Sequence, residues 1–300
     1  MFNGQIYYGE RGYLQLMADI LNKGVDVPDR TGVGSRALFD AKIVYQADES
    51  PFSTVRPLSP KKAFDEFWFF MSGRTQTKAL EAKGVNFWKA NTSREFLDNR
   101  GLNHLEEGDM GLAYGAQFRH FNKGLGIEDK RVVDQLRQTY EILKTDPYSR
   151  RLYTTFWNPS ASPLMALTPC WHSHQFVVLP NEEGKNVLHM KMLNRSLDAC
   201  YGFQFAVIQY RIYQMCLAKL LGFEMGTMVC DLNQTHLYAN QLEYSREILT
   251  RDLGTQGKMT INKELHTLED MINLEWSDLD ITGLEVNRTP FKTPAPPVAA

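Results

Sequence analysis

The chain has 300 residues, of which 43% are hydrophobic and 12% aromatic, enough to bury the core of one large domain or two small ones. Its formal charge of −2 gives no electrostatic reason to expect a nucleic acid or an anionic membrane as a partner. No apolar run approaches the roughly 18 residues of a membrane-spanning helix, and no charged and apolar leader opens the sequence. We therefore expect a cytoplasmic protein.

The elements of the first half follow from apolar spacing. Residues 13–23 have helical spacing, and residues 29–34, with two glycines, predict a turn. Alternation over residues 37–46 predicts a strand. Residues 61–71 predict an aromatic-rich helix, and residues 131–144 predict a clearer amphipathic helix.

The second half changes to a period of two. Strands are predicted at residues 152–157, 174–179, 187–193 and 227–232. Residues 205–221 are apolar on nearly every face, which predicts a helix buried at the centre of the protein. Residues 240–251 predict an amphipathic helix, and the proline-rich tail from residue 289 has no core-forming pattern.

No internal repeat or low-complexity linker divides the sequence. We predict one domain over residues 1–300, of the α+β class. Its expected architecture is a mostly antiparallel sheet wrapped by helices, one of them internal.

The cysteines indicate a reducing compartment, because no pair among Cys170, Cys200, Cys216 and Cys230 has C-x-x-C spacing. Cys170 and Arg195 belong to neighbouring predicted strands. A guanidinium beside a thiol favours the thiolate, which could attack an electrophilic carbon. The alternative is a buried structural cysteine beside an unrelated surface arginine.

Eight segments, in order along the chain, together resemble the thymidylate synthase family, which includes pyrimidine nucleotide hydroxymethylases. A single segment such as Asp-Arg-Thr-Gly-Val-Gly would be weak evidence, but the ordered set is specific. The match runs from the first helix to the C-terminal region. The segments are residues 29–34, 66–73, 88–97, 108–119, 146–159, 169–170, 194–198 and 235–240.

The resemblance implies a reaction at C5 of a pyrimidine nucleoside monophosphate. Cys170 would add to C6, so that C5 becomes a nucleophile and takes the methylene group of 5,10-methylenetetrahydrofolate. Hydride transfer would then give a methyl group, and attack by water a hydroxymethyl group. Glu66 would move protons through water, and its aromatic neighbours favour a buried carboxylate over a solvated one.

The resemblance also implies the roles of the other site residues. Cys170, Glu66, Arg195 and Tyr114 would form the catalytic group. The 5′-phosphate would bind Ser196 and four arginines: Arg30, Arg195 and, from a partner subunit, Arg150 and Arg151. An obligate homodimer with shared active sites follows, although paired arginines on a loop often serve only solubility.

For the rest of the nucleotide and the folate, the resemblance assigns six further residues. His236 and Tyr238 would hold the sugar 3′-hydroxyl, unless His236 is a structural histidine. Asp198 would bind the pterin through its side chain and base O2 through its N–H. Trp88, Asn91 and Gly202 complete the folate set. No metal is expected. The last three residues, 298–300, resemble the family's closing tail only loosely.

Two residues depart from the family pattern at the C4 edge of the base. Ala206 occupies the position of the asparagine that reads uracil in family synthases, and Trp171 replaces a histidine. An alanine has no polar group with which to discriminate. His172, His174 and Gln204 are candidate replacements, acting directly or through water.

We hypothesise that the substrate is CMP or dCMP and the product is its 5-hydroxymethyl derivative. The alternatives are a divergent thymidylate synthase, a dUMP hydroxymethylase and a cytidylate methylase. Rival readings from other classes are a metal site at Cys170, His172 and His174, a cysteine hydrolase, and a non-catalytic nucleotide-binding homologue.

Overall fold

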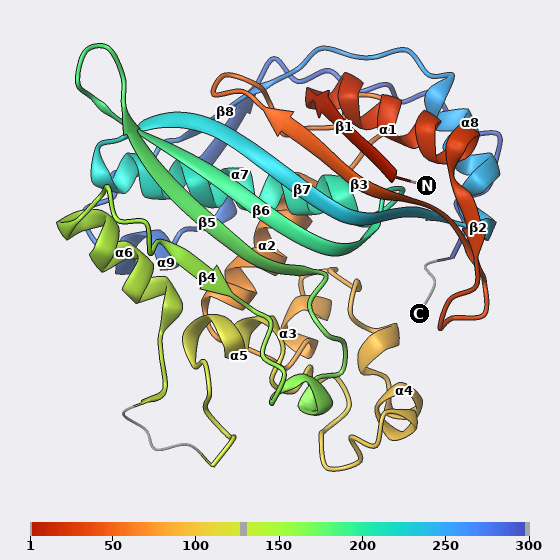
Figure 1. Ribbon diagram of the computed structural model, residues 1–300, viewed down its shortest axis with the longest axis horizontal. Coiled ribbons are helices and arrows are strands. Elements are labelled where there is room, and N and C mark those ends of the chain that lie inside the picture. Colours follow the sequence, from red (N-terminus) through yellow and green to blue (C-terminus); the bar gives the residue numbers. More distant parts are fainter. Residues whose placement is uncertain (1, 127–130, 298–300) are drawn as a thin grey trace.

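A seven-stranded sheet forms one layer of the protein, with helices packed on one of its faces (Figure 1). The computed structural model describes residues 2–126 and 131–297. The main path of the sheet runs β1-β3-β7-β6-β5-β4, and β2 pairs with β3. The strands are β1 (Phe2–Tyr8), β2 (Val25–Val27), β3 (Ser35–Tyr45), β4 (Tyr153–Thr155), β5 (Trp171–Pro180), β6 (Asn186–Asp198) and β7 (Glu224–Tyr238).

The sheet is mixed, with antiparallel pairs in the majority. β1 pairs with β3 and β6 pairs with β7 in parallel, whereas every other pair in this sheet is antiparallel. Together with the surrounding helices, this confirms the predicted α+β class. A second, two-stranded sheet joins β8 (Lys258–Ile261) to β9 (Leu279–Thr282).

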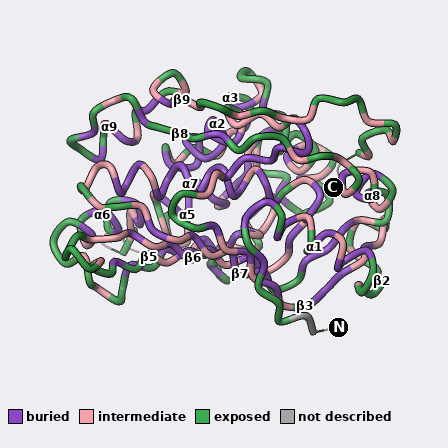
Figure 2. Tube along the Cα trace, turned by 90° about the horizontal axis from the view of Figure 1, so that it is seen from above, coloured by how far each residue is buried: buried purple, intermediate pink, exposed green. Residues whose placement is uncertain are grey.

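Helices cover one face of the main sheet, and Figure 2 shows the sheet as the lower layer with the helices above it. The longer helices are α1 (Gly9–Lys23), α2 (Pro60–Met71), α6 (Gln135–Thr145), α7 (Gly202–Leu221) and α8 (Leu242–Leu249). The shorter ones are α3 (Lys78–Glu81), α4 (Arg94–Asn99), α5 (Tyr114–Arg119), α9 (Leu268–Ile272) and the 3₁₀ turns η1 (Ala90–Thr92), η3 (Ser162–Leu164), η4 (Ala239–Gln241) and η5 (Trp276–Asp278). No helix within residues 2–126 and 131–297 is both long and apolar enough to cross a bilayer.

Helix α7 is the predicted internal helix, and it begins three residues earlier than expected. It contacts α2 on one side and β6 and β7 on the other. Just before the helix, Asp198 Oδ1 accepts hydrogen bonds from the backbone N–H groups of Cys200 and Tyr201 (2.9 and 3.0 Å), which fixes the turn that leads into it. It ends at Gly222, whose φ of 68° is a left-handed conformation that favours glycine.

Strands β6 and β7 extend several residues beyond the predicted ranges, and β1 was not predicted. The missed ends of β6 and β7 carry polar side chains, including Arg195, His236 and Tyr238. Apolar alternation fails there because these side chains line cavities rather than the core. Helix α6 begins at Gln135 instead of residue 131, because Asp134 caps it by accepting from Arg137 N.

Candidate active site

Strand register brings the predicted site residues to one end of the sheet. β6 and β7 are parallel, so their C-terminal ends lie together, with Asp198 opposite His236. β3 runs antiparallel to β7, and its first residue, Ser35, pairs with Tyr238 just after the 29–34 loop. β5 runs antiparallel to β6 and begins beside it, with Trp171 opposite Asn194.

Two cavities open at this end of the sheet and share Leu167, Cys170 and Ser196. The first, which we call the aromatic cavity, has a volume of about 350 Å³. Of the predicted site residues it is lined by Glu66, Trp88, Tyr114, Cys170, Trp171, Ser196, Asp198, Gly202 and Ala206. The second, the arginine cavity, has a volume of about 500 Å³ and is lined by Arg30, Asn91, Cys170, Arg195, Ser196, His236 and Tyr238. Asn91 thus lies in the arginine cavity, apart from the other residues assigned to the folate.

Cys170 lies where the two cavities meet, just before β5. Arg195 binds the turn that carries it: Nε donates to Pro169 O (2.9 Å), and Nη2 lies 4.0 Å from the sulfur of Cys170. On the other side, the hydroxyl of Tyr114 accepts hydrogen bonds from the backbone N–H groups of Cys170 and Trp171 (2.9 and 3.3 Å). The position of the sulfur is therefore set from two directions.

The protonation of Cys170 differs from the simple expectation of an arginine-stabilised thiolate. Burial raises the pKa of the Cys170 thiol, and this effect exceeds the opposing influence of Arg195. Asp198 raises the same pKa, whereas Arg30 lowers it. Arg195 therefore offsets part of the cost of ionising a buried thiol, and the thiol form is the resting one.

Glu66 is a buried carboxyl in α2, 8% exposed, facing the aromatic cavity. Desolvation raises its pKa to about 7, despite hydrogen bonds that lower it. Trp88 Nε1 donates to Oε1 (2.6 Å) and Gln209 Nε2 donates to Oε2 (2.5 Å). A carboxyl with such a pKa can both take up and release a proton near neutral pH.

The 29–34 loop presents Arg30 to the arginine cavity. Asp29 Oδ1 accepts from the backbone N and the hydroxyl of Thr31 (2.8 and 2.7 Å), which fixes the turn. Gly32 and Gly34 have φ values of 74° and 78°, a conformation that side chains disfavour.

His236 and Tyr238 also line the arginine cavity, with ring centroids 4.9 Å apart. Nδ1 of His236 is buried and has no hydrogen-bond partner among the described residues. Burial lowers the pKa of this histidine, so the neutral imidazole is favoured. A neutral, unpartnered ring nitrogen can bind a hydroxyl group.

Arg150 and Arg151 line neither cavity. Both are exposed in the turn between α6 and β4. The family resemblance assigned them to the site of a partner subunit. Because they line no cavity of their own chain, they could take part in a site only in an oligomer, and that assignment stays a prediction.

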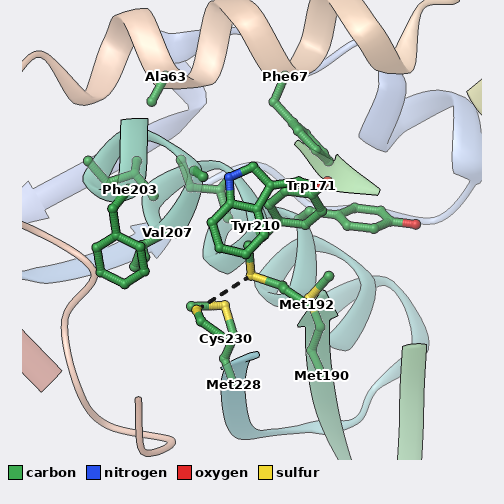
Figure 3. Close-up of a cluster of buried hydrophobic side chains, with 14 of the residues drawn as sticks. Ala63, Phe67, Trp171, Met190, Met192, Phe203, Val207, Tyr210, Met228 and Cys230 are labelled. Atoms are coloured by element: carbon green, nitrogen blue, oxygen red, sulfur yellow. Dashed lines mark hydrogen bonds between the residues drawn. The ribbon is translucent and has the colours of Figure 1, made fainter. Parts of the chain in front are cut away.

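Trp171 on β5 and Ala206 on α7 both line the aromatic cavity, and we call this part of the cavity its inner wall. The indole of Trp171 packs on α7, against Phe203 and Tyr210, with ring centroids 6.4 and 6.2 Å apart (Figure 3). Ala206 is 4% exposed and brings only a methyl group to the cavity.

The three candidate replacements for a base-reading asparagine are wrong. His174 is fully buried, with Phe118, Phe156 and other rings around it, and burial lowers its pKa to about 3. Gln204 is buried on a side of α7 that lines neither cavity, and His172 lines neither cavity and bonds Ser173 (2.9 Å). The sequence pattern shows which residues of a strand or helix share a face, but it could not reveal which face meets the cavity.

The sequence missed two polar residues of the aromatic cavity, Gln209 and Asn194. Gln209 follows Ala206 by one helical turn, and this spacing was the available signal. Asn194 is 2% exposed, and neither atom of its amide has a partner among the described residues.

Within residues 2–126 and 131–297, no group of three or more His, Cys, Asp and Glu side chains could hold a metal ion. The described end of the tail lies beside the aromatic cavity, where Tyr201 donates from its hydroxyl to Pro296 O (2.8 Å). The final three residues fall outside the described part of the chain.

Residues 11–293 match the family model of thymidylate synthase. The chain belongs to the thymidylate synthase family. It is 35% identical to the human thymidylate synthase over 94% of this chain and 89% of that protein. The thymidylate synthase of equine herpesvirus 2 is also 35% identical, over 87% of this chain and 90% of the viral protein. The bifunctional dihydrofolate reductase-thymidylate synthase of Leishmania major is 34% identical, over 91% of this chain and 52% of that longer protein.

Members of the thymidylate synthase family are one-carbon transferases that use 5,10-methylenetetrahydrofolate. The aromatic cavity fits such a cosubstrate, because Trp88, Phe87 and Phe205 offer flat apolar walls to a pterin ring. Asp198 adds a carboxylate at the same cavity. Its oxygens already accept from Cys200 N, Tyr201 N and Gln241 Nε2, which orients the group.

Replacing Glu66 with Gln should stabilise the protein at alkaline pH. The folded-state pKa of about 7 exceeds the ordinary 4.5, so the folded protein holds a proton that the unfolded chain releases. Stability from this group is present below pH 4.5 and is lost as the pH rises through 7. The loss corresponds to about 3 kcal/mol at pH 8.

Chemical denaturation of Glu66→Gln and wild type at pH 5 and pH 8 measures the effect. The variant should gain stability over wild type at pH 8 and little at pH 5. Glu95→Gln, at an exposed position of α4, is the matched control and should change neither value. An equal effect of Glu66→Gln at both pH values would contradict the raised pKa.

Proposed function

We propose that this protein transfers the one-carbon unit of 5,10-methylenetetrahydrofolate to C5 of a pyrimidine nucleoside 5′-monophosphate. The supporting observation is the position of Cys170, whose sulfur lies between a cavity lined by arginines and a cavity lined by aromatic rings. The phosphate and sugar of the nucleotide would occupy the arginine cavity, and the base would extend past Cys170 into the aromatic cavity. The folate, bound against the outer aromatic walls, supplies the methylene carbon and, for a methyl product, the hydride.

The residues of this chain would act in a fixed order. Arg195 and Tyr114 hold Cys170 so that its sulfur adds to C6, with loss of the thiol proton, while the C5–C6 double bond supplies electrons that make C5 a nucleophile. Glu66, with a pKa of about 7, supplies and removes protons at the C4 side of the ring through water. After C5 has bonded the methylene carbon, loss of the C5 proton would accompany cleavage of the bond from that carbon to the folate nitrogen. Hydride or water would then add to the transferred carbon as the sulfur leaves C6, which restores the ring.

Thymidylate synthesis from dUMP is the first candidate reaction. The thymidylate synthases described above carry that name and match this chain over nearly its whole length. Hydroxymethylation of CMP or dCMP is the second candidate. It is favoured by Ala206, which offers no polar group where the family resemblance expects the uracil-reading asparagine.

Incubation with 5,10-methylenetetrahydrofolate and each of dUMP, dCMP, UMP and CMP tests the proposal. We expect a C5 product from at least one nucleotide, and its mass separates methyl from hydroxymethyl. Formation of dihydrofolate accompanies methylation only. Cys170→Ser should abolish turnover, and a 5-fluoropyrimidine nucleotide with folate should form an adduct on Cys170. Turnover that survives Cys170→Ser would overturn the proposal.

Replacing Ala206 with Asn should improve binding of dUMP by about tenfold, because an amide in the aromatic cavity can pair with N3 and O4 of uracil. Isothermal titration of dUMP and dCMP against the variant and wild type measures the change. Ala206→Leu fills a similar volume without polar atoms and should not improve binding. A gain of the same size with Leu would show that volume, and not hydrogen bonding, is responsible.

We also propose that two copies pair through the uncovered face of the sheet. Figure 1 shows one face of the sheet without helices over it. Tyr8, Tyr153, Val177 and Leu179 are exposed by 41–55%, and each alternates along its strand with a buried neighbour that faces the helices. Apolar side chains on an open sheet face are typical of an interface. Arg150 and Arg151 precede β4 at this layer, so each copy would send its arginine pair to the other's arginine cavity.

Mixing two inactive variants tests the shared site. Cys170→Ser and the double variant Arg150→Ala/Arg151→Ala should each have low activity, and their mixed dimer contains one intact site. After exchange of subunits, activity should recover to about a quarter of wild type. Cys170→Ser mixed with Glu66→Gln is the control. Each chain supplies both Cys170 and Glu66 to its own site, so each site of the mixed dimer keeps one defect and no intact site forms. A mixture that stays inactive, or a monomer by sedimentation, would contradict the proposal.

A further inference from the structure

Gln209 is a polar residue of the aromatic cavity to which the sequence assigned no role. It lies on α7 one turn after Ala206, and both residues line the cavity. Its side chain is 6% exposed, and its Nε2 donates to Oε2 of Glu66 (2.5 Å). Gln209 therefore stands beside the carboxyl that we assign to the C4 side of the base.

The bond to Glu66 determines which end of the Gln209 amide is available. Glu66 accepts from Trp88 at one oxygen and from Gln209 at the other, so the nitrogen of Gln209 is turned toward the carboxylate. The remaining amide oxygen, Oε1, receives no hydrogen bond from residues 2–126 or 131–297. Oε1 of Gln204 is buried without a hydrogen-bond partner, whereas Oε1 of Gln209 is not buried in this way. An accessible acceptor therefore faces the cavity.

A hydrogen-bond acceptor at this place discriminates between the two pyrimidine bases. C4 of cytosine carries an amino group, which donates, whereas C4 of uracil carries an oxygen, which accepts. An amide oxygen pairs with the first and repels the second. In a buried cavity the unpaired oxygen of the wrong ligand also loses its hydration without compensation.

We propose that Gln209 reads the C4 substituent of the base and selects a cytosine nucleotide over a uracil nucleotide. This inference rests on the proposed function and favours the second of its two candidate reactions. Ala206 brings no polar group to the cavity, and the amide of Gln209, one helical turn further along α7, would be the reading group instead.

Equilibrium binding of CMP, dCMP, UMP and dUMP to the full-length protein tests the proposal, with isothermal titration at pH 8. Wild type should bind each cytosine nucleotide about 10- to 100-fold more tightly than the uracil nucleotide with the same sugar. Gln209→Met keeps the length of the side chain and removes its polar atoms, and the ratio should fall to within about threefold. Gln204→Met makes the same replacement on the same helix away from both cavities, and the ratio should remain that of wild type.

A change in the ligand gives a test that does not depend on a folded variant. The monophosphate of the pyrimidin-2-one nucleoside lacks the C4 substituent and should bind wild type about tenfold or more weakly than CMP. In Gln209→Met this difference should disappear.

The outcomes separate the two proposals. If wild type binds pyrimidine nucleotides but does not prefer cytosine, or if Gln209→Met retains the preference, the role of Gln209 is rejected while the proposed function stands. If no pyrimidine nucleotide binds, or purine nucleotides bind equally well, both proposals fail.

Discussion

The crossover from β6 through α7 to β7 is the constraint on which the site depends. Because these strands are parallel neighbours, their C-terminal ends meet and hold Arg195, Asp198 and His236 together. The connecting helix must then cross the back of the sheet, where it is buried between β6 and α2. One face of that helix, including Ala206 and Gln209, becomes the inner wall of the aromatic cavity. A single topological unit therefore positions the residues that we propose for the phosphate, the sugar and the base.

The same burial that shapes the cavities makes their ionisable groups costly. Desolvation raises the pKa values of both Cys170 and Glu66, so the folded protein favours their neutral forms. Neighbouring donors reduce this cost without removing it: Arg195 acts on the thiol, and Trp88 and Gln209 act on the carboxyl. A carboxyl with a pKa of about 7, as at Glu66, suits a reaction in which protons must move both ways.

The inner wall of the aromatic cavity separates what is general in the family from what is particular to this chain. In the proposed function, Cys170, Glu66 and the arginine cavity would supply chemistry that any pyrimidine nucleoside monophosphate could undergo. Ala206, Trp171 and Gln209 line the inner wall of the same cavity, where the proposed function would place the edge at which cytosine and uracil differ. In the proposed reading, selectivity would depend on these neutral side chains, and the orientation of Gln209 is set by its hydrogen bond to the buried carboxyl of Glu66.

The sequence by itself determined most of the longer helices and strands and proposed the reacting groups, because apolar periodicity and ordered motifs are local. It identified the internal helix, the pairing partners Cys170 and Arg195, and the buried character of Glu66. Division of the site into two cavities, the place of Asn91, and the failure of His172, His174 and Gln204 as base-reading groups were decided by tertiary structure. These depend on which face of a strand or helix meets a cavity and on how far burial outweighs a nearby charge. Both depend on contacts between segments that are distant in the chain, so no local sequence pattern reveals them.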